Sequence, residues 1–393
     1  PVRQAGHKQM NKFYVSTKIY SGPNSLDVLG RFHGKRVWVV CDSFIAKSPA
    51  IGRLTRQLEP HNLVQIYSDI TPDPSIGLVV SGIGQFLDFR PQLVIGFGGG
   101  SAMDCAKGVG ARIAQPNKPI NKIRGLLRVH RLLPLLIAVP TTAGTGSEVT
   151  LAAVITDDET HYKYPINDFV LIPRFAVHDP EFTCGLPASI TGQTGMDALT
   201  HAVEAFIGRS TTPYTRKMAR QAVQLIHDNL LEAYEHGYDM RARRNMLSAA
   251  YKAGVAFTRS YVGYVHAIAH SLGGRYGIPH GLANAIILPH MLRAYGDAAA
   301  PKLADLARMA GIAPATAQDS LAAEAFIDWV DRMNEILGIP KYVSGIRRSD
   351  IPEMAAHADA EANPLYPVPL LMDRLELERM YEVVAGGMFE DEN

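Results

Sequence analysis

Asp197, His201, His266, His270 and His280 have the residue types and spacing of a divalent-metal site. Asp197 and His201 stand four residues apart in a helical segment, so both side chains project from one face of it. His266 and His270 repeat this spacing, and His280 lies between a proline and a glycine in a segment expected to be a loop. Imidazole and carboxylate ligands in this mixture suit iron(II) or zinc. Spacing alone leaves open whether His266 or His270 is the ligand.

A single Asp/His pair of this kind also has a simpler explanation, a hydrogen bond on a helix surface. That explanation accounts less well for two pairs and a further histidine set in apolar helices, because buried ionisable groups need partners. Four of the 14 histidines fall between positions 266 and 290, which is a marked concentration. The last of them, His290, follows a proline and is expected at a helix start or on the surface.

Residues 96–100, Gly-Phe-Gly-Gly-Gly, follow an apolar run and precede a predicted helix that ends near residue 114. Consecutive glycines allow backbone N–H groups to approach an anion, and a helix N-terminus adds partial positive charge. Ser101 is the expected N-cap of this helix. A diphosphate is therefore the natural ligand. A tight turn that needs glycine only for its shape is the alternative, since the spaced G-x-G-x-x-G pattern is absent.

Two further features favour a dinucleotide over a simple turn. Asp42 ends an earlier predicted strand, where a carboxylate can accept hydrogen bonds from ribose hydroxyls and would repel the extra phosphate of NADP. The strand that ends at Pro140 runs into Thr-Thr-Ala-Gly-Thr-Gly-Ser-Glu, a loop rich in hydroxyl groups. Ligands of open α/β sheets bind at the carboxyl ends of the strands. The sequence therefore predicts an NAD site at this edge of a sheet.

Alternating strands and helices must position these loops. Apolar or β-rich runs bounded by turn residues predict strands at 36–42, 62–67, 93–97 and 135–139, with a helix at about 51–58. Such alternation is typical of a mostly parallel sheet covered by helices. From about residue 186 the spacing becomes helical, with helices expected at 198–206, 218–234, 243–257, 303–309 and 321–336. We therefore predict an α/β dinucleotide-binding domain at 10–185 and an all-helical domain at 186–393.

Length and composition agree with this division. A chain of 393 residues is longer than one hydrophobic core usually serves. The formal net charge of +1 argues against a nucleic-acid partner, and no uncharged apolar run is long enough for a membrane helix. Three scattered cysteines and the lack of an apolar secretory segment favour the cytoplasm. Residues 1–9 are interpreted as an upstream extension or an expression remnant.

Four motifs resemble those of the iron-containing alcohol dehydrogenase family, and the likeness extends over about residues 13–384. They are GGGSAMDCAK at 98–107, PTTAGTGSEVT at 140–150, TGMDALTHAVEAF at 194–206 and HAIAHSLGGRYGIPHGLANA at 266–285. Among the branches of that family, the sequence looks most like bacterial enzymes that reduce short aldehydes such as propanal. The resemblance implies the fold shared with dehydroquinate synthase, an α/β NAD-binding domain and an all-α metal-binding domain with the site in the cleft between them.

The resemblance also implies residue roles. The family's ligands for Fe²⁺, with Zn²⁺ also admitted, match Asp197, His201, His266 and His280, and His270 matches a histidine that is a candidate for proton transfer. Its cofactor contacts match Asp42, Asp73, Gly99, Gly100, Ser101, Thr141, Thr142, Thr145 and Lys163. The implied activity is reversible hydride transfer between NAD(H) and a small primary alcohol or aldehyde, in a homodimer or larger homo-oligomer. A bacterial microcompartment is a location that the resemblance also allows.

Two departures from the family pattern concern the substrate. Tyr261 and Tyr264 precede the first histidine of the HAIAH segment, where many relatives have small or aliphatic residues, and they could reshape the alcohol pocket or simply pack between helices. Residues 149–154 lack the amide of some diol-reducing relatives, which favours a simple alcohol. The alternatives are a zinc-dependent glycerol or diol dehydrogenase of the same fold and a dehydroquinate synthase-like lyase. The lyase would need a cluster of basic residues to hold an acidic, phosphorylated substrate, and the helical half shows no such cluster around the candidate ligands.

Overall fold

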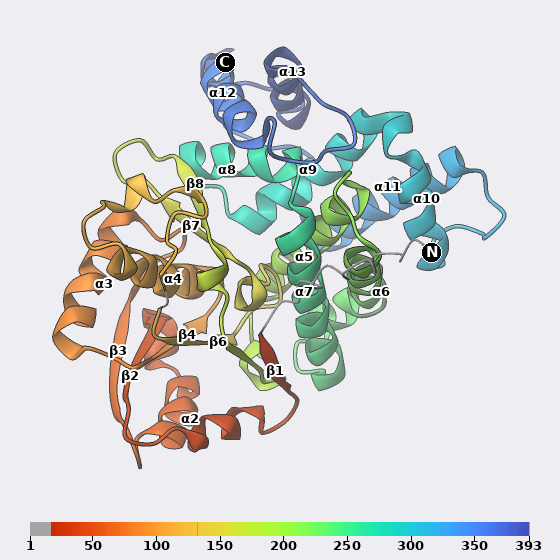
Figure 1. Ribbon diagram of the computed structural model, residues 1–393. Helices are drawn as coiled ribbons and strands as arrows, with labels where there is room; N and C mark the ends of the chain where they lie inside the picture. The colour runs from red at the N-terminus through yellow and green to blue at the C-terminus, as the bar shows by residue number, and fades with distance from the viewer. Residues whose placement is uncertain (1–16, 132, 393) are drawn as a thin grey trace, which may run out of the picture.

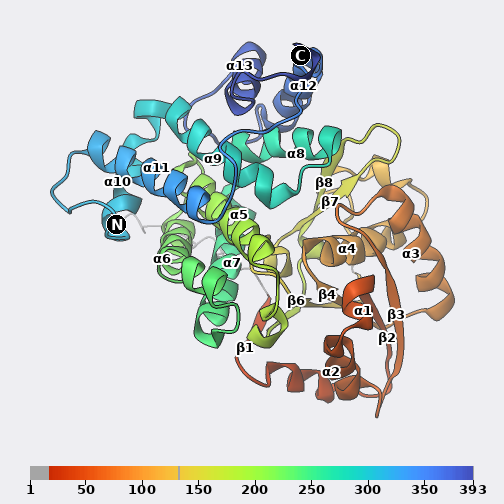
Figure 2. The same cartoon turned by 180° about the vertical axis from the view of Figure 1, so that it is seen from behind.

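The computed structural model describes residues 17–131 and 133–392, so the interpretation of residues 1–9 lies outside the described part. The first half of the chain forms an α/β region and the second half a helical region beside it, as Figures 1 and 2 show from opposite sides. This arrangement confirms the predicted fold class. In the described residues, no helix is both long enough and apolar enough for a transmembrane span.

Six parallel strands form the main sheet, in the spatial order β1-β9-β6-β4-β2-β3. The strands are β1 (Lys18–Ser21), β2 (Arg36–Asp42), β3 (Leu63–Ile70), β4 (Leu93–Gly98), β6 (Leu135–Pro140) and β9 (Phe175–His178). The four predicted strands correspond to β2, β3, β4 and β6, whereas β1 and β9 have only four residues each and gave no clear pattern. Because β2, β4 and β6 are neighbours that run in one direction, their carboxyl ends lie together at one edge of the sheet.

Alternate residues of the central strands pack on opposite faces of this sheet. Trp38 and Val94 belong to an apolar cluster with α3 (Ile76–Phe89) and α4 (Gly100–Ala114). Their neighbours Val37 and Ile95 belong to a second cluster with α1 (Ser43–Lys47) and α2 (Pro49–Leu58). Side chains of a strand point alternately to either face, so a strand covered on both faces must be apolar throughout. This explains the continuous apolar runs that identified β2 and β4.

Helices make up the second half of the described chain, and residues 186–392 contain no strand. All five predicted helices lie within observed ones, and further helices carry the histidine segment and the C-terminal region. The helices are α5 (Ala188–Ile207), α6 (Pro213–Glu235), α7 (Met240–Ser260), α8 (Tyr264–Tyr276), α9 (His280–Tyr295), α10 (Ala300–Met309), α11 (Asp319–Ile336), α12 (Ile351–Ala362) and α13 (Arg374–Val384). The domain boundary at about 185 stays a prediction.

A second, smaller sheet lies between α4 and α8 (Figure 1) and was not predicted. It consists of β5 (Gly125–Leu126), β8 (Lys163–Asn167) and β7 (Ala152–Thr156), with β7 and β8 antiparallel. The burial of β7 alternates along its five residues, which is too short a run to be distinguished from a loop in the sequence. This sheet matters because both β7 and β8 contribute to the central cavity.

Two sequence predictions about helix starts are wrong. The N-cap of α4 is Gly99 rather than Ser101, which lies within the first turn. His290 neither begins a helix nor lies on the surface: it is buried inside α9, and its Nε2 donates to the Lys341 carbonyl. Pro289 has no backbone N–H and so cannot donate to the Ala285 carbonyl four residues earlier. Asn334 Nδ2 donates to that carbonyl instead, at 2.7 Å, and the helix therefore tolerates the proline.

Candidate active site

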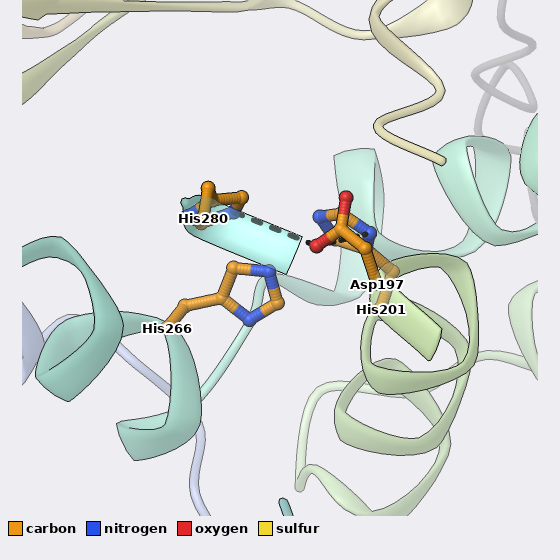
Figure 3. Close-up of side chains that lie close together, drawn as sticks. All are labelled: Asp197, His201, His266 and His280. Carbon is orange, nitrogen blue, oxygen red and sulfur yellow. Dashed lines mark ion pairs between the residues drawn. The ribbon is translucent and has the colours of Figure 1, made fainter. Parts of the chain in front are cut away.

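Four side chains from three helices converge on one point in the helical region (Figure 3). Asp197 and His201 come from α5, His266 from α8, and His280 is the first residue of α9 rather than part of a loop. Each residue offers one ligand atom, and these four atoms all lie within 4.8 Å of one another. Three of the side chains are buried and His280 is half-buried. The i, i+4 spacing in the sequence therefore reflects a shared helix face.

Hydrogen bonds from neighbouring residues orient this cluster. Glu204, one turn beyond His201 on α5, accepts from Nδ1 of His266 at 2.5 Å, which directs Nε2 of that ring into the cluster. Asn284, one turn into α9, donates from Nδ2 to Asp197 Oδ1 at 2.7 Å and lies 3.1–3.2 Å from Nε2 of His280 and His266. Neither Glu204 nor Asn284 was predicted, although both are spaced by helical turns from a predicted residue.

The electrostatics of the cluster fit a divalent cation. Burial lowers the pKa of His201, and lowers those of His266 and His280 well below the usual value, which favours the neutral imidazoles that bind metals. Burial raises the pKa of Asp197, although His201 and the hydrogen bond from Asn284 oppose the shift. Nδ1 of His201 is buried with no hydrogen-bond partner among the described residues. Three neutral imidazoles around one buried carboxylate form a donor set that suits iron(II) or zinc.

The glycine-rich turn lies at the carboxyl end of β4, at the N-terminus of α4. Gly98 has a φ of +157°, a conformation that side-chain-bearing residues rarely adopt. A Cβ on Gly100 would lie 2.7 Å from Cγ2 of Thr145, and one on Gly99 would lie 3.4 Å from Oγ1 of Thr142. The turn thus packs directly against the threonine loop that follows β6. No side chain of the described residues caps the N-terminus of α4, so the backbone N–H groups of its first turn are available to bind an anion.

The other predicted cofactor residues surround this turn. Thr141 directly follows β6 and is buried, and its N–H donates to the Gly98 carbonyl. Ser101 Oγ accepts from the backbone N–H of Asp73, and the Asp73 carboxylate forms a 2.8 Å ion pair with the buried Lys163. Asp42 has a role that the sequence did not indicate, because its Oδ1 accepts from the N–H of Ile45 at 2.8 Å and caps α1.

A cavity of about 230 Å³ joins the glycine turn to the histidine cluster. Its lining includes Asp73, Gly100, Ser101, Thr145 and Lys163 from the predicted cofactor set and His201, His266, His270 and His280 from the helical half. The remaining cofactor candidates, Asp42, Gly99, Thr141 and Thr142, do not line it. One cavity therefore connects a glycine turn suited to binding a phosphate with a cluster of side chains suited to binding a metal.

His270 lines the same cavity but is not one of the four converging residues. Its Nδ1 lies 2.8 Å from Oε1 of Glu361 on α12, and Tyr366, another cavity residue, donates to the same oxygen at 2.7 Å. The ring stacks on that of His280 with centroids 5.2 Å apart. Glu361 and Tyr366 were missed because nothing in their sequence neighbourhood indicates a partner about ninety residues away.

The two tyrosines flagged in the sequence have different positions. Tyr261 ends α7 with a φ of +62° and lines the cavity with Phe257, Val262 and Leu151. Tyr264 does not line the cavity: it is buried, and its hydroxyl bonds to Asn363 Oδ1 at 2.8 Å. Of the two, only Tyr261 therefore shapes the space beside the metal-type site.

Two family profiles match the chain. The profile of the iron-containing alcohol dehydrogenases matches residues 16–180. The profile of the C-terminal part of the Fe-containing alcohol dehydrogenase family matches residues 191–383. Together these matches include all the residues that converge on the cavity from β4, β6, α5, α8 and α9.

Relatives of known activity cover almost the whole chain. It is 41% identical over 360 residues to the 1-propanol dehydrogenase PduQ of Salmonella typhimurium strain LT2, covering 90% of this chain and 94% of that protein. It is 36% identical over 364 residues to the 1,3-propanediol dehydrogenase of Klebsiella pneumoniae, with the same coverage of 90% and 94%.

Solved structures resemble the fold of this chain over a similar length. A crystal structure of 1,3-propanediol oxidoreductase superimposes with a TM-score of 0.87 at 35% identity, covering 93% of this chain and 97% of that chain. The alcohol dehydrogenase from Oenococcus oeni superimposes with a TM-score of 0.89 at 32% identity, again covering 93% and 97%. The likeness therefore includes both the sheet and the helical region.

Proposed function

Because this chain belongs to the iron-containing alcohol dehydrogenase family, we propose that it interconverts a short primary alcohol and its aldehyde. NAD-dependent alcohol dehydrogenase activity follows from the family and its named members. The observation that carries the proposal is the cavity that contains both the glycine turn and the histidine cluster. A cofactor whose diphosphate binds at Gly99–Gly100–Ser101 would extend its nicotinamide toward the helical half.

We assign Asp197, His201, His266 and His280 as the ligands of a divalent iron, with zinc as the second candidate. When bound, such a cation supplies Lewis acidity, which lowers the pKa of an alcohol hydroxyl and polarises an aldehyde carbonyl. Glu204 and Asn284 hold the donor atoms in place through the hydrogen bonds described above. The ring of Phe257 stacks on His201 with centroids 4.3 Å apart, which excludes water from one side of that ligand.

His270 is the residue that we propose to accept the alcohol proton and pass it on. The ring lines the cavity next to the ligand His280, and its hydrogen bond to Glu361 uses Nδ1. Nε2 is then the nitrogen that can accept a proton. A positioned acid–base group of this kind contributes roughly 10²–10⁴ to a rate.

The walls of the cavity favour a simple alcohol over glycerol or a diol. Leu151, Phe257, Tyr261 and Val262 are mostly apolar, and Leu151 lies in the segment that lacks an amide. The relative at 41% identity is named a 1-propanol dehydrogenase, which also points to a short unbranched substrate. Among the described lining residues, Lys163 is the only Lys or Arg, and it is paired with Asp73. The cavity therefore offers few cationic groups to bind a phosphorylated, acidic substrate such as that of a dehydroquinate synthase-like lyase.

The test is metal analysis and activity of protein purified anaerobically. The metal-free protein is reloaded with Fe²⁺ or Zn²⁺ and assayed for NADH oxidation with propanal, longer aldehydes, dihydroxyacetone and 3-hydroxypropanal. We expect the highest kcat/KM with a short simple aldehyde. Preference for dihydroxyacetone or 3-hydroxypropanal would support the glycerol or diol alternative. Absence of NADH oxidation with every carbonyl compound and either metal would contradict the proposal.

A further inference from the structure

Glu361 lies near the end of α12, yet its carboxylate reaches the cavity wall formed by α8. The side chain is only 5% exposed and its Oε1 is 2.8 Å from Nδ1 of His270. The hydroxyl of Tyr366 donates to the same oxygen at 2.7 Å. A buried charge is tolerated only when hydrogen-bond donors satisfy it, and this carboxylate oxygen has two donors. The two hydrogen bonds together fix the position of the oxygen.

The identity of these groups determines the direction of each hydrogen bond. An ionised carboxylate only accepts, so Nδ1 of His270 must carry the proton in that bond. Burial and the charge of Glu361 raise the pKa of Tyr366 well above its usual value, so the phenol keeps its proton and donates it. In neutral His270 the other nitrogen, Nε2, is then unprotonated. The hydrogen bonds of His270 within the described residues involve Nδ1 alone.

The segment that carries Glu361 and Tyr366 is tied to the helix that carries His270. The hydroxyl of Tyr264, the first residue of α8, bonds to Oδ1 of Asn363 at 2.8 Å. Nδ2 of Asn363 in turn donates to the Met372 carbonyl at 3.0 Å. These contacts fix the distance between α8 and residues 361–366. Tyr264, which does not reach the cavity, thus acts on it through this support.

We propose that Glu361, assisted by Tyr366, is a positioning residue that holds His270 in the Nδ1–H tautomer with Nε2 presented to the cavity. The inference rests on the proton-transfer role proposed for His270. It explains why a C-terminal helix delivers an acid to a site built by α5, α8 and α9. A carboxylate behind a histidine fixes the tautomer and the orientation of the ring in the same way in hydrolase triads.

A purely structural role for Glu361, as a buried carboxylate that happens to be satisfied, makes different predictions. Glu361→Gln preserves the volume of the side chain, but its amide can donate to Nδ1 and so permits the opposite tautomer. Glu361→Asp keeps the charge with a shorter reach. If the role is only structural, Gln should be tolerated at least as well as Asp. If the role is positioning, Asp should restore part of what Gln loses.

The experiment combines a tautomer measurement with kinetics. The Zn²⁺-loaded, ¹⁵N-histidine-labelled protein is studied by NMR, in which the shifts of the two ring nitrogens report which one carries the proton. We expect the Nδ1–H form of His270 in the wild type and a new Nε2–H population in Glu361→Gln. We also expect kcat to fall roughly 10- to 100-fold with KM for the aldehyde and bound metal nearly unchanged. Glu361→Asp should recover part of both signals.

The surface pair Glu232 and His236 offers a matched control. Nδ1 of His236 lies 3.1 Å from Oε1 of Glu232, but both side chains are exposed, so Glu232→Gln should leave kcat unchanged. If Glu361→Gln does not load metal, the same measurements on Tyr366→Phe decide the question, with a smaller effect expected in the same direction.

An unchanged His270 tautomer together with an unchanged kcat in these variants would overturn the proposal. The role of His270 itself is tested separately. If Glu361→Gln shifts the tautomer but His270→Ala turns over as fast as the wild type, the positioning stands and the proposed relay fails.

Discussion

Nδ1 of His266 donates to Oε2 of Glu204 across 2.5 Å, although the two residues belong to different helices. Glu204 also accepts from the backbone N–H groups of Gly263 and Val265 at 2.9 Å, so one buried carboxylate holds both the ring of His266, a proposed ligand, and the turn that starts its helix. We therefore expect Glu204→Gln to weaken metal binding by roughly 10- to 100-fold. Titration of the metal-free protein with Zn²⁺ measures this, with Glu232→Gln as the control. Equal affinity in Glu204→Gln and wild type would contradict the assignment.

His270→Ala should separate proton transfer from metal binding. Because His270 is outside the four-residue cluster, the variant should retain metal in a ratio of about one per chain, while kcat falls by roughly 10²–10⁴. Elemental analysis and single-turnover kinetics with NADH check the two parts. Loss of the metal in this variant would instead make His270 a ligand. His236→Ala, which removes an exposed histidine, should change neither quantity.

Gly100→Ala should impair the dinucleotide site through a steric clash. The added Cβ would lie 2.7 Å from Cγ2 and 3.1 Å from Oγ1 of Thr145, so the threonine loop or the helix start must move. We expect a loss of unfolding free energy of about 1–3 kcal/mol and an increase of several-fold or more in the Kd for NADH. Fluorescence titration with NADH and urea denaturation measure these effects.

Gly84→Ala is the matched control, because Gly84 is exposed on α3 and a Cβ there meets no atom within 4 Å. It should leave NADH binding unchanged and stabilise the protein by roughly 0.5–1 kcal/mol through helix propensity. If both glycine variants bind NADH as the wild type does, the turn is not the diphosphate site.

Lys107 is a buried cation that anchors the loop after β6. Its Nζ lies 2.6–3.2 Å from five oxygen atoms, which accept its hydrogen bonds. They are the carbonyl and hydroxyl oxygens of Ser147, the carbonyl and hydroxyl oxygens of Thr150, and the Ala152 carbonyl oxygen. Lys107→Met leaves these acceptors unsatisfied and removes the cation near Asp104 and Glu148. We expect a loss of about 3–5 kcal/mol in unfolding free energy. Lys252→Met, which removes one bond from a half-buried lysine, should cost about 1 kcal/mol or less.

The same lysine should give the stability a specific pH dependence. Burial lowers the pKa of Lys107 from 10.5 to about 8, although Asp104 and Glu148 oppose the shift. Between these two values the unfolded chain binds more protons than the folded one at this position, so its contribution to stability rises with pH. Below about pH 8 the residue is protonated in both states and contributes no slope. The difference in unfolding free energy between wild type and Lys107→Met, measured from pH 7 to pH 10, should therefore increase.

Local patterns in the sequence predicted those parts of the fold that depend on neighbouring residues. Strands covered on both faces are apolar throughout, so β2 and β4 were found nearly to the residue. The pair Asp197 and His201 shares a helix face by spacing alone, and the structure brings both to one point with His266 and His280. Which of His266 and His270 joins that cluster depends on how α8 lies against α5 and α9, and spacing does not contain that information.

Contacts between distant segments account for what was missed or wrong. Glu361 meets His270 only because α12 packs on α8. Ser101 was expected to cap α4, but the N-cap is Gly99, two residues earlier, and the serine hydroxyl accepts from the backbone N–H of Asp73 instead. His290 was expected at a helix start because a proline precedes it. Asn334, on another helix, supplies the hydrogen bond that the proline lacks and lets α9 continue.

The order of these elements along the chain has a consequence for biosynthesis. Every strand of the six-stranded sheet precedes the four converging residues, and His280 is the last of those four to be synthesised. Segments of a protein generally fold as they emerge from the ribosome, N-terminal parts first. The nucleotide-binding sheet can therefore form before the metal site is complete. Binding of the proposed ion would then be a late step of maturation, because it requires α5, α8 and α9 to be packed together.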